Sequence, residues 1–232
     1  MELIWHGLVQ AFRLIIAGDP EVMRITFLSL KVSGLATLLS LVFGIPLGAF
    51  IGLARFPGRG FVLSLINTGM ALPPVVVGLF VSILLWRSGP LGVLQLLYSP
   101  TAIVIAQFIL AFPVVTGLTV TAMQQIDPKL RLQLLGLGAS RAQLLVQLLK
   151  EARLAMLAAV MAGFGAVISE IGASMMVGGN ILGYTRVLTT ATVLETAKGN
   201  FDMAIALSII LLVITFLINW GLTAIQQYGN RR

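Results

Sequence analysis

The sequence contains no cysteine and a single histidine, His6. A disulfide framework and a thiolate metal site are therefore excluded, and no Cys-His or Ser-His pair is available for nucleophilic catalysis of the triad type. The phosphate-binding pattern G-x-x-x-x-G-K-[ST] is also missing, so the chain does not bind ATP through a P-loop. No paired carboxylates lie within the long apolar runs to act as general acid and base. These absences argue against an enzyme.

Charge is scarce as well. Only 10% of the 232 residues are charged and 58% are hydrophobic, whereas a soluble domain carries about 25% charged residues. The composition therefore predicts an integral membrane protein in contact with the lipid bilayer. The net charge of +7 does not indicate a nucleic-acid partner, because the basic residues stand singly at the ends of apolar runs.

The apolar runs predict an all-α membrane protein with five transmembrane helices, each long enough to cross a bilayer at about 20 residues per crossing. We expect them at residues 27–53, 61–86, 101–123, 154–177 and 203–225. Residues 1–25 form a separate N-terminal segment, residues 26–225 the transmembrane domain, and residues 226–232 a tail. In the N-terminal segment, polar side chains follow one helical stripe, which favours an amphipathic helix lying in the membrane interface over one that crosses it: Glu2, His6, Gln10 and Arg13.

The distribution of lysine and arginine predicts the orientation. Placing the N-terminus outside and the C-terminus in the cytoplasm puts nine basic residues on the inner side and six on the outer side. The inner nine are Arg55, Arg59, Lys129, Arg131, Arg141, Lys150, Arg153, Arg231 and Arg232.

Residues 127–153 are the one long polar interruption between apolar runs, and they must face water. Asp127 followed by Pro128 predicts an N-cap and the first residue of a helix that extends through Leu137. Gly136 and Gly138 then let the backbone turn. Ser140, with a glutamine three residues later, predicts a capping box and a second, amphipathic helix.

This loop resembles the one by which permeases of ABC importers dock on their ATPase subunits. The resemblance lies in the segment LLGLGASR at residues 134–141, followed by the amphipathic helix. It implies that the loop couples the permease to an ATPase, through Leu134, Leu137, Gly138, Ala139, Ser140 and Arg141.

Two further segments resemble permeases of the molybdate type. LPPVVVG at residues 72–78 contains Pro73 and Pro74, which free backbone carbonyls inside the membrane and predict a broken helix beside the pathway. SLKVS at residues 29–33 shows the same resemblance. Between them, Gly44, Gly48 and Gly52 recur at a spacing of four residues, which predicts a face that packs closely on another helix.

Two spans contain polar residues that are pathway candidates. Thr116 and Thr119 lie in the third span, where threonine hydroxyls usually bond their own backbone; the alternative is that they line the path of an oxyanion. Glu170 is the only acidic residue deep in a span, and such a carboxylate is a functional candidate by default. SEIGAS at residues 169–174 resembles the gate-bearing helix of molybdate and tungstate permeases. The alternative role for Glu170 is a structural hydrogen bond that caps a helix.

Residues 178–200 are too short in apolar length to span the membrane and resemble the outer loop that closes the pathway in the same permeases. Gly178 and Asn180 lie in its first turn. Arg186 is its one strong anion-attracting group near Glu170, and the alternative role for Arg186 is anchoring in the lipid headgroups.

Together the resemblances cover about residues 26–225 and imply the fold of a type I ABC importer permease, closest in pattern to tungstate permeases. They imply a homodimer with two cytoplasmic ATP-binding cassette subunits and a periplasmic or extracellular substrate-binding protein. ATP and Mg²⁺ would be bound by the ATPase partner and no cofactor by this chain. The implied cargo is tungstate or molybdate. Alternatives are a sulfate or phosphate permease and an ion-coupled secondary transporter.

Overall fold

The computed structural model describes residues 2–229, and it describes side chains for residues 4–227. Met1 and residues 230–232 lie outside it, and with them the end of the expected tail and two arginines of the charge count. The described residues form eleven α-helices and one 3-10 turn, η1, with no strand among them. The elements are α1 (Glu2–Ala17), α2 (Pro20–Leu53), α3 (Arg59–Met70), α4 (Pro74–Leu85), η1 (Gly92–Leu94), α5 (Pro100–Gln124), α6 (Pro128–Gly136), α7 (Arg141–Glu151), α8 (Arg153–Ile168), α9 (Gly172–Gly178), α10 (Leu188–Ala197) and α11 (Phe201–Gly229).

Three of these helices, α2, α5 and α11, are each long and apolar enough to cross a membrane alone. The expected second span consists of α3 and α4, which meet at 98°. The expected fourth span is likewise interrupted, because α8 ends at Ile168 and α9 begins at Gly172. The break at the prolines agrees with the sequence prediction, whereas the break within residues 154–177 was not predicted.

Helix starts follow local capping rules. The carboxylate of Asp19 accepts hydrogen bonds from the backbone N–H groups of Glu21 and Val22, both at 3.0 Å, so α2 begins at Pro20, seven residues before the expected span. The side chain of Ser99 caps α5 in the same way. A polar N-cap followed by proline thus sets where these helices start.

The centre of the molecule is the contact between α2 and α5. A Cβ atom added at Gly48 would lie 2.6 Å from the backbone oxygen of Thr116, and one at Gly52 would lie 2.7 Å from the Cβ of Met123. Such short distances mean that these glycines let the two backbones approach closely, as the four-residue spacing predicts.

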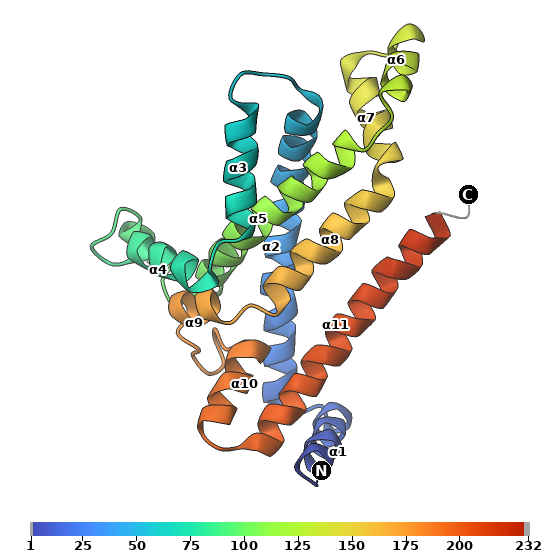
Figure 1. Cartoon of the computed structure of the whole chain (residues 1–232). Coiled ribbons are helices and arrows are strands. Elements are labelled where there is room, and N and C mark those ends of the chain that lie inside the picture. The colour runs from blue at the N-terminus through green and yellow to red at the C-terminus, as the bar shows by residue number, and fades with distance from the viewer. Residues whose placement is uncertain (1, 230–232) are drawn as a thin grey trace.

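Several connections between helices lie at the two ends of the molecule (Figure 1). The α2–α3 connection, the α6–α7 pair and the end of α11 lie at one end, and α1 lies with the α10–α11 turn at the other. Helix α1 packs against the start of α11, where Gly7 makes close contact with Ile205. The chain therefore places its longest polar segment and its N-terminal helix at opposite ends.

Candidate coupling loop and pathway residues

The α6–α7 pair forms a helix, a turn and a second helix. Asp127 accepts a hydrogen bond from the backbone N–H of Lys129 at 2.8 Å, and Ser140 and Gln143 form the expected capping box. Gly138 has φ = 82°, a backbone conformation that glycine adopts without strain. Gly136, in contrast, is the last residue of α6, so only one of the two predicted glycines makes the turn.

The elbow, which we define as residues 134–141, is exposed at its tip. Leu137 is 85% exposed, and a Cβ atom added at Gly138 would meet nothing within 4 Å. The base is anchored, because Leu144 and Leu148 of α7 are buried in a cluster with Met123 of α5. The exposed tip is therefore connected through α7 to the central α2–α5 pair.

Glu170 lies in the break between α8 and α9 and is 5% exposed. Its two carboxylate oxygens accept hydrogen bonds from the backbone N–H of Ala173 at 2.7 Å, from the backbone N–H of Ser174 at 2.9 Å and from the Ser174 hydroxyl at 2.7 Å. These groups belong to the first turn of α9. The carboxylate thus caps a helix, which is the structural role weighed above.

Gln107 joins the same group of residues and was not singled out from the sequence. Its side-chain amide donates to the backbone oxygen of Val167 at 3.1 Å and to the Ser174 hydroxyl at 3.4 Å, which ties α5 to both sides of the break. Its Oε1 atom is buried and has no hydrogen-bond partner among the described residues. The available signal was its position as a lone glutamine in the middle of an apolar run.

Helix α4 follows the break at the prolines, helix α9 follows the break at Glu170, and these two helices pack on each other. A Cβ atom added at Gly78 would lie 2.8 Å from the Cα of Ala173, and one at Gly172 would lie 2.8 Å from the side chain of Val75. Pro73 and Pro74 are exposed at the start of α4, beside this contact. The proline break and the glutamate break are therefore adjacent.

The corner after α9 is held by Thr185, another residue that sequence reasoning missed. Its hydroxyl donates to the backbone oxygen of Gly178 at 2.6 Å and accepts from the backbone N–H of Ile181 at 2.9 Å. Asn180 has φ = 50°, and its amide donates to the backbone oxygen of Thr190 at 3.4 Å. This loop is consequently a fixed turn.

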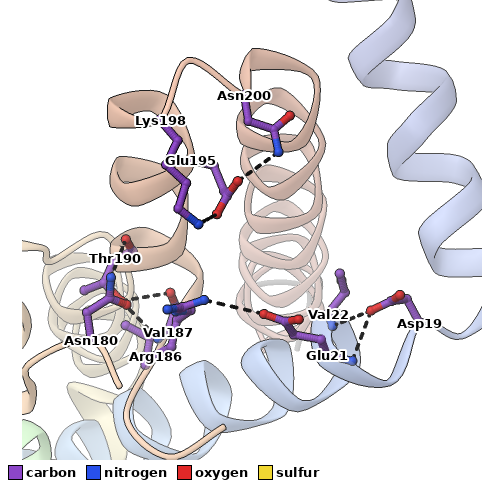
Figure 2. A network of polar contacts seen from close by, with 10 residues as sticks. All are labelled: Asp19, Glu21, Val22, Asn180, Arg186, Val187, Thr190, Glu195, Lys198 and Asn200. Carbon is purple, nitrogen blue, oxygen red and sulfur yellow. Dashed lines mark hydrogen bonds and ion pairs between the residues drawn. The ribbon is translucent and has the colours of Figure 1, made fainter. Parts of the chain in front are cut away.

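Arg186 follows this turn and pairs with Glu21 at the start of α2, with the Nη1 and Oε1 atoms 3.5 Å apart (Figure 2). The side chain of Arg186 is only 14% exposed, and its buried Nε has no hydrogen-bond partner among the described residues. Glu195 stands nearby, and hydrogen bonds from Lys198 and Asn200, with the charges of Lys198 and Arg186, lower the pKa of its carboxyl.

Thr116 and Thr119 do not join this group. Both are 0% exposed in the α2–α5 contact, and their hydroxyls donate to backbone oxygens of α5 one turn earlier, each at 2.7 Å. Both hydroxyls therefore bond the backbone of their own helix, which is the first of the two roles considered for them.

The site therefore consists of two interrupted helical segments beside a glycine-packed helix pair, with an exposed elbow anchored on that pair. The chain belongs to the family described as binding-protein-dependent transport system inner membrane component, which matches residues 44–232. It is accordingly an inner-membrane component of a transporter.

Similar sequences span almost the whole chain. The chain is 40% identical over 227 residues to the tungstate uptake system permease protein of Peptoclostridium acidaminophilum, covering 98% of this chain and all of that protein. It is 34% identical to the corresponding protein of Campylobacter jejuni, covering 95% of this chain and 92% of that one. It is 30% identical to the molybdenum transport system permease protein of Escherichia coli K12, covering 91% and 97%.

Among solved structures, a chain of the MetNI methionine ABC transporter, in an inward-facing conformation, matches with a TM-score of 0.76 at 18% identity, covering 91% of this chain and 98% of that one. An amino acid ABC transporter matches with a TM-score of 0.63, also at 18% identity, covering 94% and 97%. At this identity the likeness shows the fold alone, which is that of an ABC importer permease, as predicted.

Proposed function

We propose that this chain is the permease subunit of an ATP-driven importer that carries tungstate or molybdate across the inner membrane. The observation that carries the proposal is the 40% identity to a tungstate permease along 98% of the chain. The similarity to the sulfate transport system permease protein of E. coli K12 is lower, at 29% over 86% of this chain and 72% of that protein. A sulfate or phosphate permease is therefore the second candidate.

The cargo is tested by uptake of labelled tungstate into cells that carry this chain and its neighbouring transport genes, with unlabelled competitors. We expect molybdate to compete and sulfate and phosphate not to compete in equal excess. Competition by sulfate as strong as that by tungstate would replace the proposal with the second candidate.

The driving force comes from two ATPase subunits that bind ATP and Mg²⁺ and engage the elbow of each copy in a homodimer. The exposed side chain of Leu137 suits burial in a cleft of such a partner. When ATP closes the ATPase pair, the two elbows approach each other and α7 and α8 move with them. The break at Glu170 and the turn at Gly178 lie farther along the same chain and would open the path to the outside.

The orientation in this proposal has the N-terminus outside and the C-terminus in the cytoplasm. The elbow and the basic α2–α3 connection lie at one end of the fold, which is the side predicted to be cytoplasmic (Figure 1). A secreted or surface-bound binding protein would then deliver the oxyanion near Arg186. Few fixed charges line such a route, which suits a cargo that must leave again.

Copurification separates this mechanism from an ion-coupled secondary transporter. An ATPase that remains with the chain after detergent extraction supports the proposal, and uptake by the purified chain alone, without nucleotide, would refute it. Within the complex, Gly138→Arg places a charged side chain on the elbow where space is open. We expect uptake to fall more than tenfold while ATP hydrolysis continues, because docking is disturbed and membrane insertion is not.

Gly58→Arg is the matched control, because Gly58, in the α2–α3 connection, has φ = 81°, close to that of Gly138, and a Cβ atom there also meets nothing within 4 Å. We expect it to transport normally. Full transport by Gly138→Arg would contradict the coupling role of the elbow.

The role of Arg186 is tested in the same assay. If its guanidinium contacts the oxyanion, Arg186→Lys should raise the concentration needed for half-maximal uptake, since lysine lacks the planar fork that suits an oxyanion. Glu21→Gln removes only the partner carboxylate. An effect of Glu21→Gln equal to that of Arg186→Lys would mean that the ion pair acts only in folding.

A further inference from the structure

A cavity of about 360 Å³ lies at the end of the molecule that carries the elbow, between the last turn of α2 and the start of α6. Three arginines line it: Arg55 of the α2–α3 connection, Arg59 of α3 and Arg131 of α6. The only carboxylate in its lining is Asp127. The cavity is therefore strongly basic within a chain that has few charges.

Part of this basic cluster has a structural role. The Nε of Arg59 donates to the backbone oxygen of Ile51 at 2.9 Å, and Nη1 of Arg131 donates to that of Leu53 at 3.2 Å. These bonds satisfy carbonyls at the C-terminus of α2, which lack helical partners. One bond from Arg131 leaves four of the five N–H groups of its guanidinium for another acceptor.

Arg55 has no such role. It is exposed, and it makes no hydrogen bond or ion pair with any residue that the structure describes. Asp127 does not neutralise the cluster, since its Oδ1 accepts from the backbone N–H of Lys129 and it supplies one negative charge against three positive ones. Hydrogen bonding to the end of α2 therefore accounts for some of the donors of Arg59 and Arg131 and for none of those of Arg55.

We propose that this cavity binds the phosphate group of an anionic phospholipid. Guanidinium groups hold phosphate oxygens through paired N–H donors, and basic pockets at the cytoplasmic ends of membrane helices suit lipid headgroups. The location in the inner leaflet depends on the orientation proposed above. Because the arginines come from α3, α6 and the connection before α3, one bound phosphate links the coupling loop to the end of α2.

The test uses the full chain in nanodiscs of phosphatidylcholine with a minority of phosphatidylglycerol in both leaflets, so its outcome depends neither on orientation nor on transport. Native mass spectrometry counts the phosphatidylglycerol molecules retained. We expect Arg55→Gln combined with Arg131→Gln to weaken retention by at least about tenfold. The single change Arg55→Gln, which breaks no hydrogen bond within the described residues, should weaken it by a smaller factor and leave the melting temperature unchanged.

The matched control is Arg24→Gln combined with Arg87→Gln, which removes the same charge from exposed residues outside the cavity. Equal retention by both double variants would overturn the proposal. A second arm adds inorganic phosphate to nanodiscs of phosphatidylcholine alone and measures binding by calorimetry. Phosphate that binds there, and that displaces phosphatidylglycerol at millimolar concentration, would identify a soluble anion as the occupant and overturn the assignment to lipid.

Discussion

The cap formed by Glu170 makes a quantitative prediction. The carboxylate accepts three hydrogen bonds from the first turn of α9, all within 2.9 Å and all buried. Glu170→Ala removes the carboxylate that accepts from two backbone N–H groups and from the O–H of Ser174, so these three donors lose their acceptor. At about 1–3 kcal/mol for each buried donor left unpaired, we expect a loss of at least about 3 kcal/mol in the free energy of unfolding.

Glu170→Gln should cost less, about 1–3 kcal/mol, because the amide oxygen still accepts one N–H while the amide nitrogen faces the other. The control is Glu151→Gln, an exposed residue of α7, with an expected change below about 0.5 kcal/mol. Unfolding by SDS in mixed micelles measures all three free energies. A Glu170→Ala variant as stable as the parent chain would refute the capping argument.

Uptake by the same variants separates capping from a direct role in the pathway. If Glu170 acts only as a cap, transport per folded molecule in Glu170→Gln stays near that of the parent chain. A variant that keeps its stability and loses transport would instead assign the carboxylate to the pathway.

Three further predictions concern other parts of the fold. Gly48→Ala should destabilise the chain by about 1–3 kcal/mol in the same SDS assay, since the new Cβ lies 2.6 Å from a backbone oxygen of α5, whereas Gly34→Ala on the open face of α2 should not. Thr185→Val should cost about 1–3 kcal/mol, because the buried carbonyl of Gly178 and the part-buried N–H of Ile181 lose this hydroxyl as a partner; a melting temperature equal to that of the parent chain would contradict this. The pKa of Glu195 is lowered in the folded state, so its carboxylate should stabilise the fold fully above the ordinary value of 4.5, and this stabilisation should be lost as the pH falls below that value. The melting temperature of Lys198→Met should therefore fall less in acid than that of the parent chain.

Local sequence patterns predicted much of the fold. The two helices and the turn of the α6–α7 pair were predicted because they depend on local interactions. Asp127 and Pro128 start the first helix, Gly138 permits the turn and Ser140 caps the second helix, and each effect involves only residues close in the sequence. The close packing of this face of α2 on another helix was predicted for a similar reason, since Gly44, Gly48 and Gly52 must share one face of a helix, whereas α5 was identified as the partner only by the structure.

Only the tertiary structure decided the roles of the polar residues inside the helices. Thr116 was an open candidate until α5 was seen to pack on α2, and Gln107 acquired its role through Val167 and Ser174, 60 and 67 residues away. The helix break at Glu170 could not be predicted from hydropathy, because residues 154–177 are apolar enough to form one membrane span. Hydropathy along a chain measures only the preference for lipid, whereas a buried carboxylate is stabilised by the particular donors that the fold brings to it.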